Sequence, residues 1–217
     1  MNCPNAISKT IQAIRKHLSP LPRPSVHPDT QPDPFRILIA TLISLRTKDS
    51  VTETASARLF SLASTPEKMA KLEPEAIEHA IYPAGFYKNK ASQIIRISKI
   101  LMDVHDGEVP RDRTALLELP GVGIKTANLT LSLGYGLAYI CVDTHVHRIA
   151  NRLGWISTRT PEETEQALMD VLEKKWWIGI NHILVIFGQR ICRPVSPLCT
   201  TCPVADTCPR NGVTSSR

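Results

Sequence analysis

Helix-start signals recur along this sequence, and they constrain its fold more than any other feature. A capping side chain followed directly by proline is typical of the first residues of a helix. This signal occurs at Asp33-Pro34, Thr65-Pro66 and Thr160-Pro161. No segment shows the apolar–polar alternation of a half-buried β-strand. We therefore expect about ten short helices and an all-α fold.

Further signals place individual helices. Ser50 and Glu53 have the spacing of a capping box. The segment before Gly107 carries apolar residues at steps of three and four, which predicts a helix that this glycine ends. Thr114 is placed to cap a short helix, and Asp143 is placed to cap a later one.

The chain is basic, which favours a polyanionic partner. Its 217 residues include 26 lysines and arginines against 20 acidic residues, a formal net charge of +6. This balance favours nucleic acid, although many basic proteins bind none. No apolar run approaches the length of a membrane span, and the N-terminus lacks a secretory signal. We expect an intracellular protein with no membrane partner.

A glycine-rich turn, LPGVG at residues 119–123, lies between two expected helices. Its glycines allow a tight turn whose outward N–H groups, beside a helix start, suit a phosphate oxygen. Val122 would fold back as an apolar anchor, whereas an ordinary helix–helix turn is the alternative. A looser version, PAGFY at residues 83–87, precedes Lys88 and Lys90. A loop before a solvent-exposed helix start explains that second segment equally well.

A lysine and an aspartate carry the candidate chemistry. Lys125 lies in the first turn of the helix after the glycines, where the helix dipole disfavours the ammonium form. A neutral amine is a nucleophile that can attack a sugar carbon and form a Schiff base. Asp143 heads another helix, and a carboxylate held ionised there can stabilise a sugar cation or assist proton transfer. From charge alone, a phosphate contact by Lys125 and simple capping by Asp143 are the commoner explanations.

Four of the six cysteines fall in one C-terminal run with the spacing C-x6-C-x2-C-x5-C. In a reducing compartment such a run indicates metal ligands rather than disulfides. Four thiolates suit either a tetrahedral zinc ion or an iron–sulfur cubane, and the chemistry alone leaves both open. The four residues are Cys192, Cys199, Cys202 and Cys208.

Together these motifs resemble the endonuclease III family of helix-hairpin-helix DNA glycosylases. The glycine turn with its lysine, the Val142-Asp143-Thr144-His145 segment and the cysteine run occur in the family's order. The resemblance implies a bifunctional DNA glycosylase and AP lyase of base excision repair, which removes oxidised pyrimidines and cleaves the abasic site by β-elimination. It makes Lys125 the nucleophile, Asp143 its supporting carboxylate, and the loop at residues 192–208 a [4Fe–4S] site.

The implied partner is double-stranded DNA that contains a damaged base or an abasic site, and the implied protein is a cytoplasmic, nucleoid-associated monomer. The residues expected to contact DNA are Gly121, Val122, Gly123, Thr126, Arg46, Lys88 and Lys90. One of them departs from the family, because Arg46 stands where glutamine is common. That glutamine is associated with filling the gap left by a flipped nucleotide. Arg46 could fill the same gap, contact a phosphate, or simply end a buried helix as a surface charge.

The resemblance also implies two lobes with a groove between them. Residues 27–137 would form a six-helix lobe with the hairpin, and residues 1–26 and 138–217 would form the iron–sulfur cluster lobe. Two other functions stay open. A monofunctional mismatch glycosylase of the same superfamily typically lacks the hairpin lysine, so Lys125 argues against it. A non-catalytic DNA-binding module with a structural metal is disfavoured by the joint presence of Lys125 and Asp143.

Overall fold

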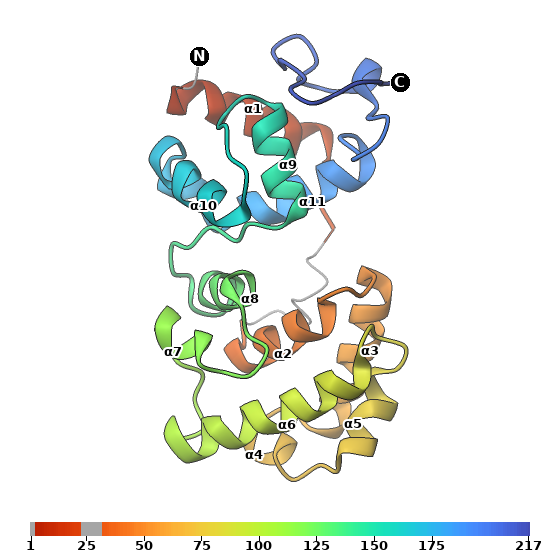
Figure 1. Cartoon of the computed structure of the whole chain (residues 1–217), viewed down its shortest axis with the longest axis vertical. Coiled ribbons are helices and arrows are strands. Elements are labelled where there is room, and N and C mark those ends of the chain that lie inside the picture. The colour runs from red at the N-terminus through yellow and green to blue at the C-terminus, as the bar shows by residue number, and fades with distance from the viewer. Residues whose placement is uncertain (1–2, 23–31) are drawn as a thin grey trace. The chain divides into compact units, whose positions relative to one another are not determined.

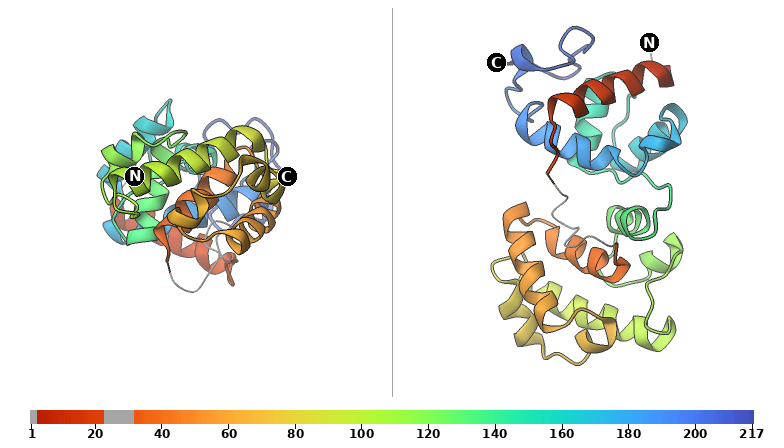
Figure 2. Two further views of the ribbon diagram at one scale, coloured as in Figure 1. Left: turned by 90° about the horizontal axis from the view of Figure 1, so that it is seen from below. Right: turned by 180° about the vertical axis from the view of Figure 1, so that it is seen from behind.

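The computed structural model describes residues 3–22 and 32–217, and the regular elements of these residues are helices with no strand (Figures 1 and 2). The predicted all-α fold is therefore confirmed. Contacts within the chain divide it into two compact units. We call Met1–Pro22 with Ala138–Arg217 the cysteine-loop unit, and Arg23–Leu137 the hairpin unit.

The cysteine-loop unit combines the N-terminal helix with the last third of the chain. In Figure 1 the red helix α1 lies among helices drawn in green and blue. Its α-helices are α1 (Pro4–His17), α9 (Thr144–Arg152), α10 (Pro161–Val171) and α11 (Ile180–Arg190), and its 3-10 turns are η2 (Lys174–Trp176) and η3 (Cys199–Thr201). Helix α1 is amphipathic and buries Ile7, Ile11 and Ile14 in a core shared with α9 and α11.

The hairpin unit is built around one apolar helix. Its elements are α2 (Pro34–Ser44), α3 (Asp49–Leu62), α4 (Pro66–Met69), α5 (Pro74–Ile81), α6 (Tyr87–Val104), α7 (Arg113–Leu117), α8 (Ile124–Leu129) and the π-helix η1 (Thr130–Gly134). Helix α2 is apolar on nearly every face and is buried because α3, α6, α8 and η1 all pack on it. This arrangement seats α8, which carries Lys125, on the core of its unit.

Some predicted helix caps are confirmed. The Asp33 carboxylate accepts hydrogen bonds from the amides of Phe35 (2.9 Å) and Arg36 (3.1 Å), and the Thr160 hydroxyl accepts one from Glu163 (3.2 Å). Helix α6 ends as expected, with the Gly107 amide bonded to a carbonyl of the last turn.

Two predicted caps are wrong. Helix α3 begins at Asp49, one residue before Ser50, so that serine lies inside the first turn and no side chain caps the helix. Helix α7 begins at Arg113 rather than after Thr114. The cap there is Asp112, whose carboxylate accepts from the Ala115 amide at 2.8 Å. Both helices begin before the residue whose hydroxyl was predicted to cap them. In α7 the Asp112 carboxylate already accepts from an amide of the first turn.

Part of the proline-rich stretch from Pro20 to Pro34 lies outside the described residues, since residues 23–31 are not described. Among the helices that are described, none combines the length and the apolar character that a membrane crossing requires.

Candidate active site and cysteine loop

The glycine turn joins α7 to α8, and the three segments together form a helical hairpin. Its apolar anchor, Val122, is 7% exposed, and its amide bonds to the Leu119 carbonyl at 3.1 Å. Gly121 has a φ of +79°, a left-handed conformation that favours glycine, and a Cβ there would lie 2.5 Å from the Gln93 amide nitrogen, so that side chain would have to move. Gly123 is exposed and has no heavy atom within 4 Å of its Cβ position. The turn therefore presents open backbone next to the start of α8.

Helix α8 begins directly after Gly123, its N-cap residue. The first intrahelical bond runs from the Ala127 amide to the Gly123 carbonyl, and amides at a helix start suit an external anion. Lys125 lies in this first turn and is half-buried. Thr126 is 1% exposed, so neither its side chain nor its amide is open to the predicted DNA contact.

Asp143 is the N-cap of α9 in the cysteine-loop unit, as predicted. One carboxylate oxygen accepts hydrogen bonds from the amides of His145 and Val146, each at 2.9 Å. Behind it, Val146 and Ile149 anchor α9 in the core. The side chain is thus held in one place by its own helix and remains half-buried.

Arg148 of α9 ties this helix to the cysteine loop, a role that sequence analysis missed. Its guanidinium donates to the carbonyls of Cys192 (3.0 Å) and Thr144 (3.3 Å). Helix α11 comes so close that a Cβ on Gly188 would collide with His145 and Arg148. Burial lowers the pKa of Arg148 from its ordinary value. In the sequence, the only sign of this role is a basic residue that lies between the apolar residues Val146 and Ile149 of α9.

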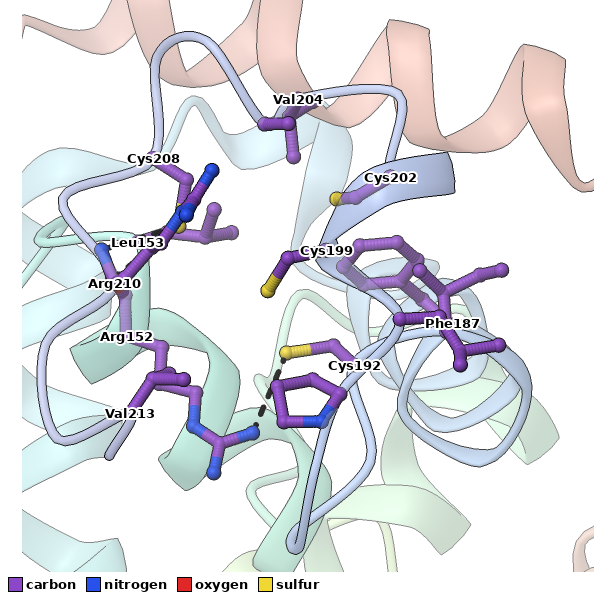
Figure 3. A pocket seen from close by; sticks show the side chains of 14 residues that line it. Arg152, Leu153, Phe187, Cys192, Cys199, Cys202, Val204, Cys208, Arg210 and Val213 are labelled. Atoms are coloured by element: carbon purple, nitrogen blue, oxygen red, sulfur yellow. Dashed lines mark hydrogen bonds between the residues drawn. The ribbon is translucent and has the colours of Figure 1, made fainter. Parts of the chain in front are cut away.

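The four clustered cysteines line one pocket (Figure 3). None of them forms a disulfide. Arg152, 8% exposed, reaches into this loop from α9 and donates to the Cys192 sulfur at 3.6 Å. The same guanidinium donates to the carbonyls of Arg193 (2.6 Å) and Pro194 (2.7 Å), and so fixes the start of the loop.

The four thiols around this pocket, and the groups that hydrogen-bond to them, fit a metal centre with thiolate ligands. Burial, together with the neighbouring cysteines, raises the pKa of the Cys202 and Cys208 thiols. The backbone amide of Arg210 donates to the Cys208 sulfur at 3.4 Å. Within residues 3–22 and 32–217, no three cysteine, histidine or acidic side chains form a compact group of the kind that holds a single metal ion. Four thiols around one pocket fit an iron–sulfur cluster, and by their chemistry alone they equally fit a zinc ion.

The predicted DNA contacts outside the hairpin separate into two exposed residues and one buried residue. Arg46 and Lys88 are exposed. Lys90 is 4% exposed, and its ammonium donates to the carbonyls of Ile43 and Leu45, both at 2.6 Å. Burial lowers the pKa of Lys90 to about 8. The structure contradicts a phosphate contact at Lys90, because its N–H donors are used inside the protein.

Comparisons with known proteins agree with these features. Residues 39–174 match the family described as HhH-GPD superfamily base excision DNA repair protein. Over 185 residues the chain is 49% identical to Endonuclease III of Thermotoga maritima, which covers 85% of this chain and 86% of that protein. This chain belongs to the endonuclease III family. Endonuclease III of Escherichia coli K12 is 38% identical over 185 residues, covering 84% and 88% of the two chains.

A solved endonuclease III structure extends the likeness to the fold. It describes a trapped endonuclease III–DNA covalent intermediate in an estranged-adenine complex. The alignment has a TM-score of 0.85 at 34% identity and covers 97% of each chain. The endonuclease III resemblance drawn from the motifs is thereby confirmed, together with the helix-hairpin-helix glycosylase fold.

Proposed function

We propose that this chain is a bifunctional DNA glycosylase and AP lyase of base excision repair. It acts on double-stranded DNA, releases an oxidised pyrimidine and then cleaves the strand at the abasic site. The observation that carries this proposal is the likeness, over 97% of the chain, to an endonuclease III trapped in covalent linkage with DNA. A covalent intermediate requires a nucleophile on the protein, and this chain offers a lysine at the start of its hairpin's second helix.

Lys125 is the proposed nucleophile. Its amine attacks C1′ of the damaged nucleotide, and the bond between C1′ and the base breaks with its electron pair leaving on the base. The departing base takes up one proton from the amine. The bond between C1′ and O4′ then breaks, O4′ takes up the second proton, and the open sugar is joined to Lys125 as a Schiff base. Loss of a C2′ proton then expels the 3′ phosphate, which is β-elimination. Lys125 lies in the first turn of α8, next to the open backbone at Gly123.

Asp143 is the proposed supporting carboxylate. Two backbone amides bond to it and fix its position, and a carboxylate held there can stabilise positive charge on the sugar or accept a proton. Lys125 belongs to the hairpin unit and Asp143 to the cysteine-loop unit. The proposed reaction therefore needs both units, which we assign as the six-helix lobe and the cluster lobe.

The hairpin is the proposed phosphate contact. The backbone around Gly121 and Gly123 binds a phosphate oxygen, and Val122 anchors the turn from beneath. Arg46 and Lys88 are the proposed side-chain contacts. The target base must leave the duplex stack, at a cost of a few kcal/mol that is smallest for damaged bases.

The cysteine loop is the proposed [4Fe–4S] site, with Cys192, Cys199, Cys202 and Cys208 as ligands. The support for this proposal is a pocket lined by four cysteines that form no disulfide. An arginine side chain donates a hydrogen bond to the sulfur of Cys192, and a backbone amide donates one to the sulfur of Cys208. When bound, the cluster contributes ligation energy that is coupled to folding. Arg152 and Arg148 hold the loop carbonyls around it.

Borohydride trapping tests the proposed function. Wild-type protein, incubated with a duplex that carries thymine glycol or an abasic site, should give a stable protein–DNA adduct when borohydride reduces the Schiff base. Lys125→Ala should abolish the adduct and still bind an uncleavable abasic analogue, because the hairpin amides remain. Lys99→Ala, which removes an exposed lysine of α6, is the matched control and should trap normally.

Two outcomes would contradict this assignment. Undiminished trapping by Lys125→Ala would mean that another amine is the nucleophile. Base release by the wild type without any adduct would favour a monofunctional glycosylase.

A further inference from the structure

Lys90 is a buried cation whose acceptors are neutral oxygens. Its ammonium donates to the carbonyls of Ile43 and Leu45 and, at 3.1 Å, to the Thr47 hydroxyl. A buried ammonium is costly unless each N–H is used, and here three donors meet three acceptors. The proposed function has no use for this lysine, since it cannot reach DNA.

The acceptors of Lys90 lie at the C-terminal end of α2. In a continuing helix the Thr47 amide would bond to the Ile43 carbonyl. It bonds to the Ser44 carbonyl instead, so the helical pattern ends and the Ile43 carbonyl accepts from Lys90. Carbonyls at a helix end carry partial negative charge, and a lysine ammonium both satisfies and stabilises them. Lys90 therefore closes the end of α2 and determines where the chain turns.

The turn that follows contains Arg46 in a left-handed conformation, with a φ of +53°. A non-glycine residue pays a conformational cost there, so surrounding contacts must hold it. Lys90 bonds to the residues on both sides, Leu45 and Thr47. From the other side, the Gly85 amide donates to the Thr47 hydroxyl at 3.1 Å, and a Cβ on Gly85 would collide with the Arg46 carbonyl oxygen.

This bend presents one exposed pair of planar side chains. The Arg46 guanidinium lies over the Phe86 ring, 5.4 Å from its centroid. Phe86 also has a left-handed backbone, with a φ of +57°, and its side chain is 60% exposed. A guanidinium and an aromatic ring are the groups on which an unstacked base can lie.

We propose that Lys90 is a positioning residue, which holds the bend at Arg46 so that the Arg46–Phe86 pair contacts DNA at the lesion. The inference rests on the proposed function for its DNA partner. It explains why a lysine that does not touch DNA lies on α6 directly below two exposed groups. It also assigns Gly85 a role, because only a residue without a Cβ allows the two turns to meet.

Binding measurements on Lys90→Met, Arg46→Ala and the double variant test this proposal. Affinities are measured for a duplex with an uncleavable abasic analogue and for the same duplex undamaged. Each single variant should lower the preference for the abasic duplex roughly tenfold, the size of one stacking contact. The double variant should lose no more than Arg46→Ala alone, because Lys90 acts through Arg46. Additive losses, or an unchanged preference in folded Lys90→Met, would overturn the proposal.

A spectroscopic measurement separates positioning from general destabilisation. 2-Aminopurine is placed opposite the abasic analogue, where its fluorescence reports how that base is stacked. At saturating protein, Lys90→Met and Arg46→Ala should change this fluorescence in the same direction and to a similar extent. A purely structural role for Lys90 would leave the signal of the saturated complex at the wild-type value and refute the proposal.

Gly85→Ala and Lys88→Met complete the design. Lys90→Met removes the donor of two carbonyls as well as the support of the bend. Gly85→Ala is therefore a second way to displace the same bend, from the other side and with Lys90 intact. It should also reduce the preference, non-additively with Arg46→Ala; an unchanged preference would count against the proposal. Lys88→Met, which alters an exposed lysine two residues away, should weaken both duplexes equally and lower the salt dependence of binding. If it instead matched Lys90→Met in selectivity, loss of charge rather than positioning would be the cause.

All these measurements use an uncleavable analogue, so they do not depend on Lys125. If the wild-type protein forms no borohydride adduct, the proposed chemistry is refuted. The binding and fluorescence measurements would still test the coupling between Lys90 and Arg46. A wild-type protein with no preference for the abasic duplex would refute the positioning role.

Discussion

At the scale of single residues, the surroundings of a charged side chain decide what it can do. Lys125 and Lys90 are both lysines near the start of a helix. Lys125 is half-buried beside open backbone, whereas Lys90 is enclosed and uses its donors on three oxygens. Asp143 is held by two backbone amides, which fix the position of its carboxylate.

Asp143→Asn should separate charge from shape. Asparagine is as good an N-cap as aspartate, so the thermal stability of this variant should stay close to the wild type. Base release should fall by roughly 10²–10⁴, the usual contribution of a catalytic carboxylate. Cleavage at a preformed abasic site should fall less, because no bond to a base remains to be broken. Asp143→Ala, the control for capping, should in addition lose about 1 kcal/mol of stability.

Lys90→Met should remove a pH dependence of stability. Burial lowers the pKa of Lys90 to about 8, below its value in the unfolded chain. Between pH of about 8 and about 10 the unfolded chain therefore binds a proton that the folded chain has lost, and the contribution of Lys90 to the free energy of unfolding rises with pH. Urea unfolding of both proteins should show wild-type stability growing relative to the variant across this window. A difference that is flat or falls would contradict the burial argument.

At the scale of elements, the hairpin shows how two glycines in one turn serve different purposes. Gly121 is required by its positive φ and by Gln93, which fills the space where a Cβ would stand. Gly123 has neither constraint, since its backbone is extended and its surroundings are open. The open side of Gly123 is where a phosphate would approach.

Gly123→Ala should weaken DNA binding without weakening the fold. Its Cβ meets no protein atom, so stability should change by no more than about 0.5 kcal/mol. Affinity for damaged and undamaged duplexes should fall equally, because backbone amides contact phosphate without reading bases. Gly121→Ala should lose stability as well as affinity, from the left-handed strain and the clash. Gly179→Ala, another open glycine, is the control and should bind normally. Full affinity in Gly123→Ala would exclude the hairpin as the phosphate contact.

At the scale of the whole molecule, the chain forms two units with separate cores. The cysteine-loop unit takes α1 from one end of the sequence and α9, α10 and α11 from the other. The C-terminal loop of this unit has little regular structure, apart from the 3-10 turn η3. Arg148 and Arg152 of α9 hold this loop through hydrogen bonds to its carbonyls.

Protein purified without chelators should be yellow-brown and contain iron and sulfide. Cys199→Ser should lose the colour and lower the thermal stability of the protein, because ligation is coupled to folding. Cys3→Ser, which alters an exposed cysteine outside the loop, should keep both the iron content and the unfolding temperature. Colourless protein with stoichiometric zinc and no iron would replace the cluster assignment with a zinc site.

The sequence by itself determined the features that depend on a few neighbouring residues. The caps at Asp33, Thr160 and Asp143 follow from a side-chain oxygen two or three residues before an amide. The glycine turn with its lysine, the segment from Val142 to His145 and the cysteine spacing are equally local, and together they indicated the family. The misplaced starts at Ser50 and Thr114 show the limit of such signals, because several nearby residues can begin a helix and packing selects one.

Only the tertiary structure decided what lies around a charged side chain. Lys90 resembles a surface lysine in sequence, but its carbonyl acceptors lie 47 and 45 residues away along the chain. Arg148 and Arg152 contact a loop about forty residues beyond them. Local patterns record propensity and periodicity, whereas burial depends on which distant elements pack together. The roles of these three residues therefore emerge only when α2, α6, α9 and the cysteine loop are seen in place.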